Sequence, residues 1–524
     1  MLVINNSPLL PDFKLPEMEL DTNIAYFYEK SQEFIEKYPE IMKSIKFDLD
    51  NYALNKKKMR NANKEYVESE SVQKGEVLFD PTAYSTPVVD LPLLTGRPRV
   101  MTAELVLFFM FVRGLWGSVS DQVAAERIKD SISIQLVLNH HGCSTPGINT
   151  IRENLNKISP GTRQLILERQ AWYIIENKFD DFRETYIDST AVAANTDFPT
   201  DIDILNKLLN RVLNSLNALS DFGLTVDLDS WTITRFKKMG KHLKFVNMNA
   251  SKGIKGKVKE EYRSFINLAD KVILSLDAAR EKLTSTWETA DFNPEKGLAL
   301  DMLWDKIDQD LWDGAYVLHY ANERIEKGIK TKSQEKILSI SDRSAGYIQK
   351  GQREAVIGYK PQIARSRNGF ICGYITPVGN AADSAMLLPT VQHLIETTGV
   401  VPELVSTDDG YASEDNIRLL QDKLGVLRVS IGGAKGKKIT DDYLWDSKEF
   451  IDARNQRSAA ESGMFTLKFN HSFGRVRRRG IDAVDAELTE KVLAYNFIQI
   501  RRKEKQRQQE QEAEALREMF PNVA

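Results

Sequence analysis

The spacing of apolar residues changes along the chain, so different segments are predicted to form helices or strands. Residues 102–114 form an apolar run of helix length, and the segments from there to 158 have the pattern of short helices joined by tight turns. From 200 to about 338, apolar pairs such as Leu208 and Leu209 recur at the helical period. This pattern predicts a long all-helical stretch in the middle of the chain.

Strand patterns lie on both sides of that helical stretch. One covers 183–188 and ends at an Asp. Two more, at 354–360 and 369–376, are separated by Asn368 and Gly369, a good hairpin signal. Later strands are expected to end at Thr407 and to cover 426–431, with helices at 384–398 and 413–424. The fold class is therefore α/β, with a mixed sheet interrupted by a helical insertion.

These patterns divide the chain into five expected parts. They are a polar and helical segment at 1–85, a compact helical domain at 86–178, an α/β domain at 179–198 and 340–480, the helical insertion at 199–339, and a charged C-terminal helix at 481–524. The short helices and turns of the second part suit a helix-turn-helix module. A plain helical bundle without DNA contact fits them equally well.

Composition narrows the class of protein. The chain has 524 residues and a net charge of −3, so a nucleic-acid partner would need a local basic surface. Two cysteines far apart exclude a disulfide framework and favour a reducing cytoplasm. The apolar run near 103–112 is about half the length that spans a bilayer, so we expect a buried helix and no membrane partner.

Charged residues recur where a helix would normally carry its apolar face. Arg454, Arg457, Glu461 and Lys468 are spaced so that they share one side of a helix. Asp188 ends one predicted strand and Asp408 follows another. Because strand ends in open sheets point into ligand crevices, the two Asp and Glu461 are candidates to hold divalent metal ions through carboxylate oxygens.

Three segments together resemble the DDE transposases of bacterial insertion sequences, whose catalytic domain is RNase H-like. The stretch Tyr186 to Thr190 resembles the first-Asp motif, and Asp408 to Tyr411 resembles the second. Arg457, Glu461 and Lys468 match the spacing of the YREK-type signature, in which Arg454 occupies the position of the Tyr. Segments ending at Lys360 and Asp383 also resemble the family's segments that precede the second Asp in the sequence.

This resemblance implies a site and a reaction. Asp188, Asp408 and Glu461 would be the catalytic residues and the ligands of two Mg²⁺ ions, for which Mn²⁺ can substitute. Water would attack the phosphodiester at the element's end, and the freed 3′-hydroxyl would then attack target DNA. Arg457 and Lys468 would hold phosphates, and Arg454 is a further candidate for DNA contact. The partners would be double-stranded DNA and at least one further copy of the chain, in a nucleoid-associated complex.

Two basic segments are candidates for further DNA contact. Residues 235–259 contain nine Lys or Arg and no acid, among them Lys252, Lys255, Lys257 and Lys259. The other segment consists of Arg475, Arg477, Arg478 and Arg479. A solvated loop is the alternative for each. For the whole chain, the alternatives are a metal-dependent nuclease of the same fold that does not join strands, and a catalytically inactive DNA-binding or assembly protein.

Overall fold

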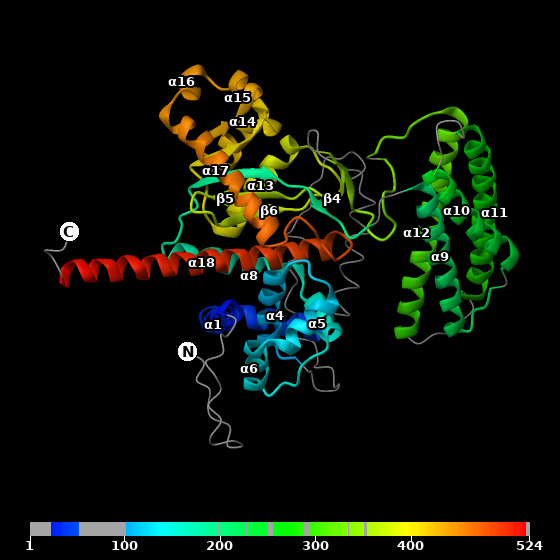
Figure 1. Ribbon diagram of the computed structural model, residues 1–524, viewed down its shortest axis with the longest axis horizontal. Helices are drawn as coiled ribbons and strands as arrows, with labels where there is room; N and C mark the ends of the chain where they lie inside the picture. The colour runs from blue at the N-terminus through cyan, green and yellow to red at the C-terminus, as the bar shows by residue number, and fades with distance from the viewer. Residues whose placement is uncertain are drawn as a thin grey trace.

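The computed structural model describes residues 22–51, 101–196, 200–226, 228–249, 255–287, 294–333, 335–349 and 354–519 (Figure 1). Its strands are β1 (Glu184–Ser189), β2 (Val192–Ala193), β3 (Gly346–Ile348), β4 (Val356–Tyr359), β5 (Gln362–Ser366), β6 (Ile371–Ile375), β7 (Leu404–Thr407) and β8 (Arg428–Ile431). The helices before β3 are α1 (Thr22–Lys37), α4 (Ala103–Trp116), α5 (Asp121–Asp130), α6 (Ile132–His140), α7 (Ile148–Lys157), α8 (Pro160–Glu176), α9 (Asp201–Ala218), α10 (Ser230–Asn249), α11 (Lys255–Trp287) and α12 (Pro294–Asn322). Those after it are α13 (Asp383–Thr398), α14 (Glu414–Leu424), α15 (Gly433–Ile439), α16 (Asp442–Trp445), α17 (Lys448–Asn470) and α18 (Ile481–Met519).

The main sheet has five strands in the order β6-β5-β1-β7-β8. Strand β5 is antiparallel to both of its neighbours, β6 and β1, whereas β7 is parallel to both of its neighbours, β1 and β8. Parallel neighbours need crossover connections, and here α13 joins β6 to β7 while α14 joins β7 to β8. The mixed α/β class predicted from the sequence is confirmed, and β1, the strand that ends near Asp188, lies in the middle of the sheet.

The hairpin prediction at Asn368 and Gly369 was correct, but it joined the wrong strands. Gly369 has φ +93°, and the hairpin pairs β6 with β5, a strand that was not predicted. The predicted strand at 354–360 is β4, which belongs to a separate sheet of order β2-β4-β3. Pro361 lies between the two strands and has no N–H to give to a ladder. The chain changes sheets at this residue.

The charged C-terminal helix predicted over 481–524 is present, but its first half is buried. Figure 1 shows α18 running between the main sheet and the N-terminal helices, with its last turns extending beyond them. Val484, Leu488, Val492, Phe497 and Ile500 are all buried, and exposure dominates only after residue 504. The first half of α18 is therefore a core helix.

Charged residues in this buried half of α18 obscured its pattern in the sequence. Glu490 pairs with Arg163 at 2.7 Å, and both side chains are at most 3 % exposed. Arg478 donates to the same carboxylate, and Lys491 pairs with Glu487 at 2.9 Å. Because buried charges are tolerated when they are paired, a helix with this composition can still lie inside the protein.

The N-terminal helices share one hydrophobic core with the sheet. Helix α4 is buried from Leu105 to Val112, as its apolar pattern predicted, and it packs on α1, α7 and α18. Its side chains belong to the same cluster as Ile187 of β1 and Phe497 of α18. Within the described residues, no single helix has the length and apolar character that a membrane crossing needs, although the bent pair α4 and α5 meets both criteria together.

The predicted helical stretch between β2 and β3 forms a bundle with its own core. Helices α9, α10, α11 and α12 lie to one side of the sheet in Figure 1, and a hydrophobic cluster separate from that of the sheet joins them. In that cluster the rings of Phe236 and Phe265 stack with centroids 4.8 Å apart. Arg211 links the bundle to the returning chain by donating to the carbonyl oxygen of Ile340 at 2.5 Å.

The crossing of α4 and α18 provides a test of this packing. A Cβ added at Gly114 would collide with the carbonyl oxygen of Glu490. We expect Gly114→Ala to lower the free energy of unfolding by about 1–3 kcal/mol, because the helices would have to move apart. Urea unfolding followed by circular dichroism measures the change.

Gly297 provides the matched control, since it lies in α12 and no described atom is within 4 Å of its added Cβ. Gly297→Ala should raise stability by about 0.5–1 kcal/mol, the usual helix preference of Ala over Gly. Equal effects of the two substitutions would contradict the close α4–α18 contact.

Candidate active site

Asp188 and Asp408 lie side by side at the carboxyl ends of two neighbouring strands of the main sheet. In the parallel pair of β1 and β7, Tyr186 lies opposite Ser406. When this pairing is continued two residues further along both chains, Asp188 lies opposite Asp408, because the two strands run in the same direction. Both residues are half-exposed at the carboxyl ends of their strands. The convergence expected of the two carboxylates is therefore present.

A buried tyrosine shows that a third carboxylate lies close by. Tyr411 is fully buried, and burial raises the pKa of its hydroxyl well above the usual value. The negative charges that raise this pKa further are those of Asp383, Asp188 and Asp408. A methyl group added at Gly410 would lie 3.1 Å from Asp408 Oδ1 and 3.4 Å from Asp383 Oδ2. Three acidic side chains thus surround one turn.

Asp383 is held in this cluster by two side chains of the neighbouring chain segment. It accepts a hydrogen bond from Gln362 Nε2 at 3.0 Å and pairs with Lys360 Nζ at 3.0 Å. Gln362 also accepts a hydrogen bond from the hydroxyl of Tyr411. Asp383 was not among the residues predicted for the site. The resemblance of the segments ending at Lys360 and Asp383 was the signal that could have found it.

Asp408 and Asp409 are adjacent in sequence but have different surroundings. Asp408 Oδ1 accepts a hydrogen bond from the N–H of Gly410 at 3.0 Å, which orders the turn after β7. Asp409 Oδ1 accepts from the N–H groups of Lys435 and Gly436 at 2.7 and 3.2 Å. Asp409 therefore caps the first turn of α15, whereas Asp408 is the member of the pair near Asp188 and Asp383.

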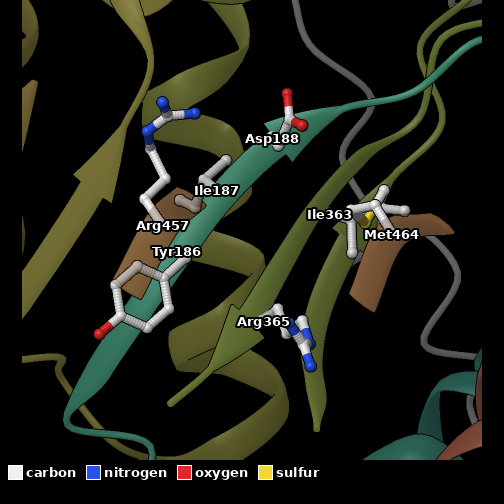
Figure 2. Close-up of a pocket in the computed structure, with 7 residues that line it drawn as sticks. All are labelled: Tyr186, Ile187, Asp188, Ile363, Arg365, Arg457 and Met464. Carbon is white, nitrogen blue, oxygen red and sulfur yellow. The ribbon is translucent and has the colours of Figure 1, made fainter. Parts of the chain in front are cut away.

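Helix α17 covers the face of β1 that carries Asp188. Tyr186 and Asp188 line a small pocket with Arg457 and Met464 of α17, and Figure 2 shows the Arg457 guanidinium on the same end of β1 as the Asp188 carboxylate. Glu461 lies four residues after Arg457 and three before Met464, so its helix position is on this same side. Its side chain is outside the described residues.

The donor set suits a hard divalent cation. Mg²⁺ and Mn²⁺ prefer carboxylate oxygens supplied from several elements, and Asp188, Asp408 and Asp383 come from a strand end, a turn and a helix start. Among the described side chains, which do not include that of Glu461, no group of three His, Cys, Asp or Glu has the geometry of a metal site. A complete ligand set would need the carboxylate of Glu461.

Residues 327–497 match the family model of the transposase DDE domain. This segment of the chain is similar to a transposase DDE domain. Neither the curated proteins nor the solved structures gave a match to it. The matched segment includes Asp383, Asp408 and Glu461, but it begins after the helical bundle and so leaves out Asp188. In the folded chain, β1 with Asp188 nevertheless pairs with β5 and β7 of the matched segment.

The arginines predicted to contact DNA have different surroundings in the structure. Arg454 stacks on the ring of Trp445 at 4.1 Å and donates to its carbonyl oxygen at 2.9 Å. Arg457 and Lys468 are both half-buried on α17. A methyl group added at Gly474 would lie 3.8 Å from Lys468 Cγ, so Lys468 borders the segment of the other predicted arginines.

That segment, 475–479, runs beside the exit of β1. Arg475 bridges to Ala193, and Arg479 donates to the carbonyl oxygen of Asn195 at 3.0 Å. Arg475, Arg477 and Arg479 are exposed. Arg478 is different, because its guanidinium makes the ion pair with buried Glu490. Three arginines of this segment are therefore exposed beside the chain that leaves β1, and one is used inside the protein.

The predicted lysines of the helical bundle are described only in part. Lys259 is exposed on α11. Lys255 and Lys257 belong to the same helix, but their side chains lie outside the described residues, as does all of Lys252. Their contact with DNA stays a prediction.

The ion pair that holds Asp383 can be tested through stability. Lys360 and Asp383 are 10 % and 19 % exposed, so replacing the ammonium with an apolar side chain leaves a largely buried carboxylate short of its charge partner. We expect Lys360→Met to lower the free energy of unfolding by about 2 kcal/mol. Urea unfolding measures this loss.

Lys423→Met is the control, because Lys423 is exposed at the end of α14 and its loss should change stability by less than about 0.5 kcal/mol. The double variant Lys360→Met with Asp383→Asn should cost less than the sum of the single changes. Additive costs would show that the two side chains do not interact.

Proposed function

We propose that this chain is a transposase of the insertion-sequence type, which binds the ends of its element, cleaves DNA phosphodiesters and transfers the 3′ ends to target DNA. The observation that carries the proposal is the level placement of Asp188 and Asp408 on adjacent parallel strands, beneath the helix that contains Glu461. The strand order β6-β5-β1-β7-β8, with three antiparallel and two added parallel strands, supports an RNase H-like catalytic domain.

Asp188, Asp408 and Glu461 are the proposed catalytic residues and the ligands of two Mg²⁺ ions, for which Mn²⁺ can substitute. Such a metal pair, when bound, activates the attacking oxygen and stabilises the leaving one. The half-exposed strand ends leave Asp188 and Asp408 accessible to a phosphodiester from solvent. Arg457, at the same end of β1 as Asp188, is suited to hold a phosphate oxygen next to the carboxylates.

Double-stranded DNA is the proposed partner, both as element end and as target. The exposed Arg475, Arg477 and Arg479 lie next to the chain that leaves β1, so a duplex at the carboxylates would pass close to them. The proposed active complex contains two or more copies of the chain, since two element ends must be joined to one target. We place this activity in the cytoplasm, at the nucleoid.

A metal-dependent nuclease that cuts without joining is the second candidate, because it would use the same three carboxylates. Incubation of duplexes carrying the DNA that flanks the gene with a target plasmid and Mg²⁺ separates the two. Joined products support the transposase, and cleavage without joining supports the nuclease. A catalytically inactive DNA-binding protein would bind the duplex and give neither product.

Removal of one carboxylate at a time tests the proposed ligands. We expect Asp188→Asn, Asp408→Asn and Glu461→Gln each to reduce Mg²⁺-dependent strand cleavage by a factor of about 10³ or more, because an amide cannot supply the anionic oxygen that the metal needs. Duplex binding measured without metal should persist. Asp415→Asn, at an exposed position of α14, serves as the control and should cleave like the unchanged protein. Full cleavage by any of the three variants would remove that residue from the site.

A further inference from the structure

The short helix α15 begins directly at the end of the sheet where the strands that carry Asp188 and Asp408 terminate. It follows β8 after one residue, Gly432, whose N–H donates to the carbonyl oxygen of Thr407 at 2.8 Å. Asp409 then caps its first turn through the N–H groups of Lys435 and Gly436. Since Thr407 and Asp409 are the neighbours of Asp408 in the chain, α15 is fixed to the same turn as this carboxylate.

Two glycines allow α15 to lie this close. Gly433 has φ +83°, and a Cβ there would lie 2.6 Å from Cβ of Asp409. A Cβ on Gly436 would collide with the carbonyl oxygen of Ile431. Neither position tolerates a side chain in this arrangement, so the contact of α15 with the strand ends is a specific one.

The surface of α15 away from the sheet is cationic. Gly436 is buried against Ile431, whereas Lys435, Lys437 and Lys438 are all exposed. Within the described part of the chain, none of these three ammonium groups makes an ion pair, not even with exposed Asp441 and Asp442 just beyond the helix.

A fourth cation, Arg457, lies close to Gly432, the residue that joins β8 to α15. A methyl group added at Gly432 would be 3.7 Å from Nε of Arg457. Arg457 of α17 and the lysines of α15 therefore border the turn of Asp408 from two helices. Such an arrangement of cations around half-exposed carboxylates matches the charge of a DNA strand, whose phosphates continue on both sides of the bond that is cut.

We propose that Lys435, Lys437 and Lys438 contact DNA phosphates next to the cleaved bond, and that Asp409 is a positioning residue that holds their helix in place. This inference rests on the proposed function for the identity of the bound strand. It gives the two neighbouring aspartates separate tasks: Asp408 belongs to the metal site, and Asp409 orders the DNA-binding helix.

The lysines are tested by a triple variant, Lys435→Ala with Lys437→Ala and Lys438→Ala. The matched control replaces Lys178, Lys423 and Lys448 with Ala; all three are exposed, and they lie near the amino ends of β1 and β8, at the opposite edge of the sheet. Both variants lose three positive charges. Binding of a short fluorescent duplex is measured in EDTA over a series of salt concentrations.

The triple variant should bind at least tenfold more weakly at low salt than the control. The slope of log affinity against log salt should fall by about 2 to 3, since each lost phosphate contact removes about 0.9 from it. The control should keep the slope of the unchanged protein. If the two variants have the same affinity and the same slope, α15 does not contact DNA and the proposal is overturned.

Asp409 is tested by two substitutions and a plasmid-nicking assay with Mg²⁺. Asp409→Asn keeps a carbonyl oxygen that can accept from Lys435 and Gly436, so it should preserve DNA affinity and the Mg²⁺ dependence of nicking. Asp409→Ala removes the acceptor and should raise KM for DNA at least fivefold, with a smaller change in kcat. If Asp409→Asn abolishes nicking as Asp408→Asn is expected to, Asp409 is a metal ligand and the positioning role is wrong.

Failure of this inference can be told apart from failure of the proposed function. An unchanged protein that binds the duplex but never nicks it would refute the enzyme while leaving the lysine comparison valid, because that comparison uses no metal. An unchanged protein that nicks, together with a triple variant that binds like the control, would refute only the role of α15. Thermal unfolding of each variant checks that it is folded. If Asp409→Ala does not fold, the binding measurements on the triple lysine variant decide whether α15 contacts DNA.

Discussion

The parallel pairing of β1 with β7 is the constraint on which the candidate site depends. The N–H groups of Glu403 and Leu404 both donate to the carbonyl oxygen of Arg183, which fixes the start of the pairing. From there the register brings Asp188 level with Asp408. A slip of one residue would turn one of the two carboxylates to the other face of the sheet, because side chains alternate along a strand. The position of α17 and the tie of α15 to Asp409 matter for the site only while this register holds.

A second layer of constraint comes from the buried charges of α18. Lys491 is fully buried, and its ammonium group donates to the carbonyl oxygens of Ser472 and Arg475 at 3.1 and 2.6 Å. Glu487 accepts from the N–H groups of Arg477 and Arg478 at 2.9 Å. These hydrogen bonds fix the backbone of 475–479 beside the exit of β1. The position of the exposed arginines is thus determined by charges that are themselves inaccessible to DNA.

Local signals in the sequence were sufficient for Asp188 and Asp408, since each follows a short apolar strand. Local signals failed where a residue's role depends on a distant partner. Strand β5 was missed because the predicted strand ended at Lys360, before Pro361, and the short segment after this proline was not recognised as a strand of a different sheet. The burial of α18 was missed because Glu490 and Lys491 look solvated until Arg163 and Glu487 are placed against them. The ion pair of Asp383 with Lys360 was not predicted for the same reason, since it exists only in the folded chain.

The helical bundle separates Asp188 from the rest of the site in sequence but not in space. The chain leaves the sheet just after Asp188, and it returns through β3, which pairs with β4 as β2 does. The two ends of the bundle are therefore held together by one small sheet, so its length adds little to the entropy cost of closing the loop. This explains how β1 can remain the central strand although the family match begins only at residue 327. It also fixes the start and the end of the bundle near the carboxyl end of β1, where Asp188 lies.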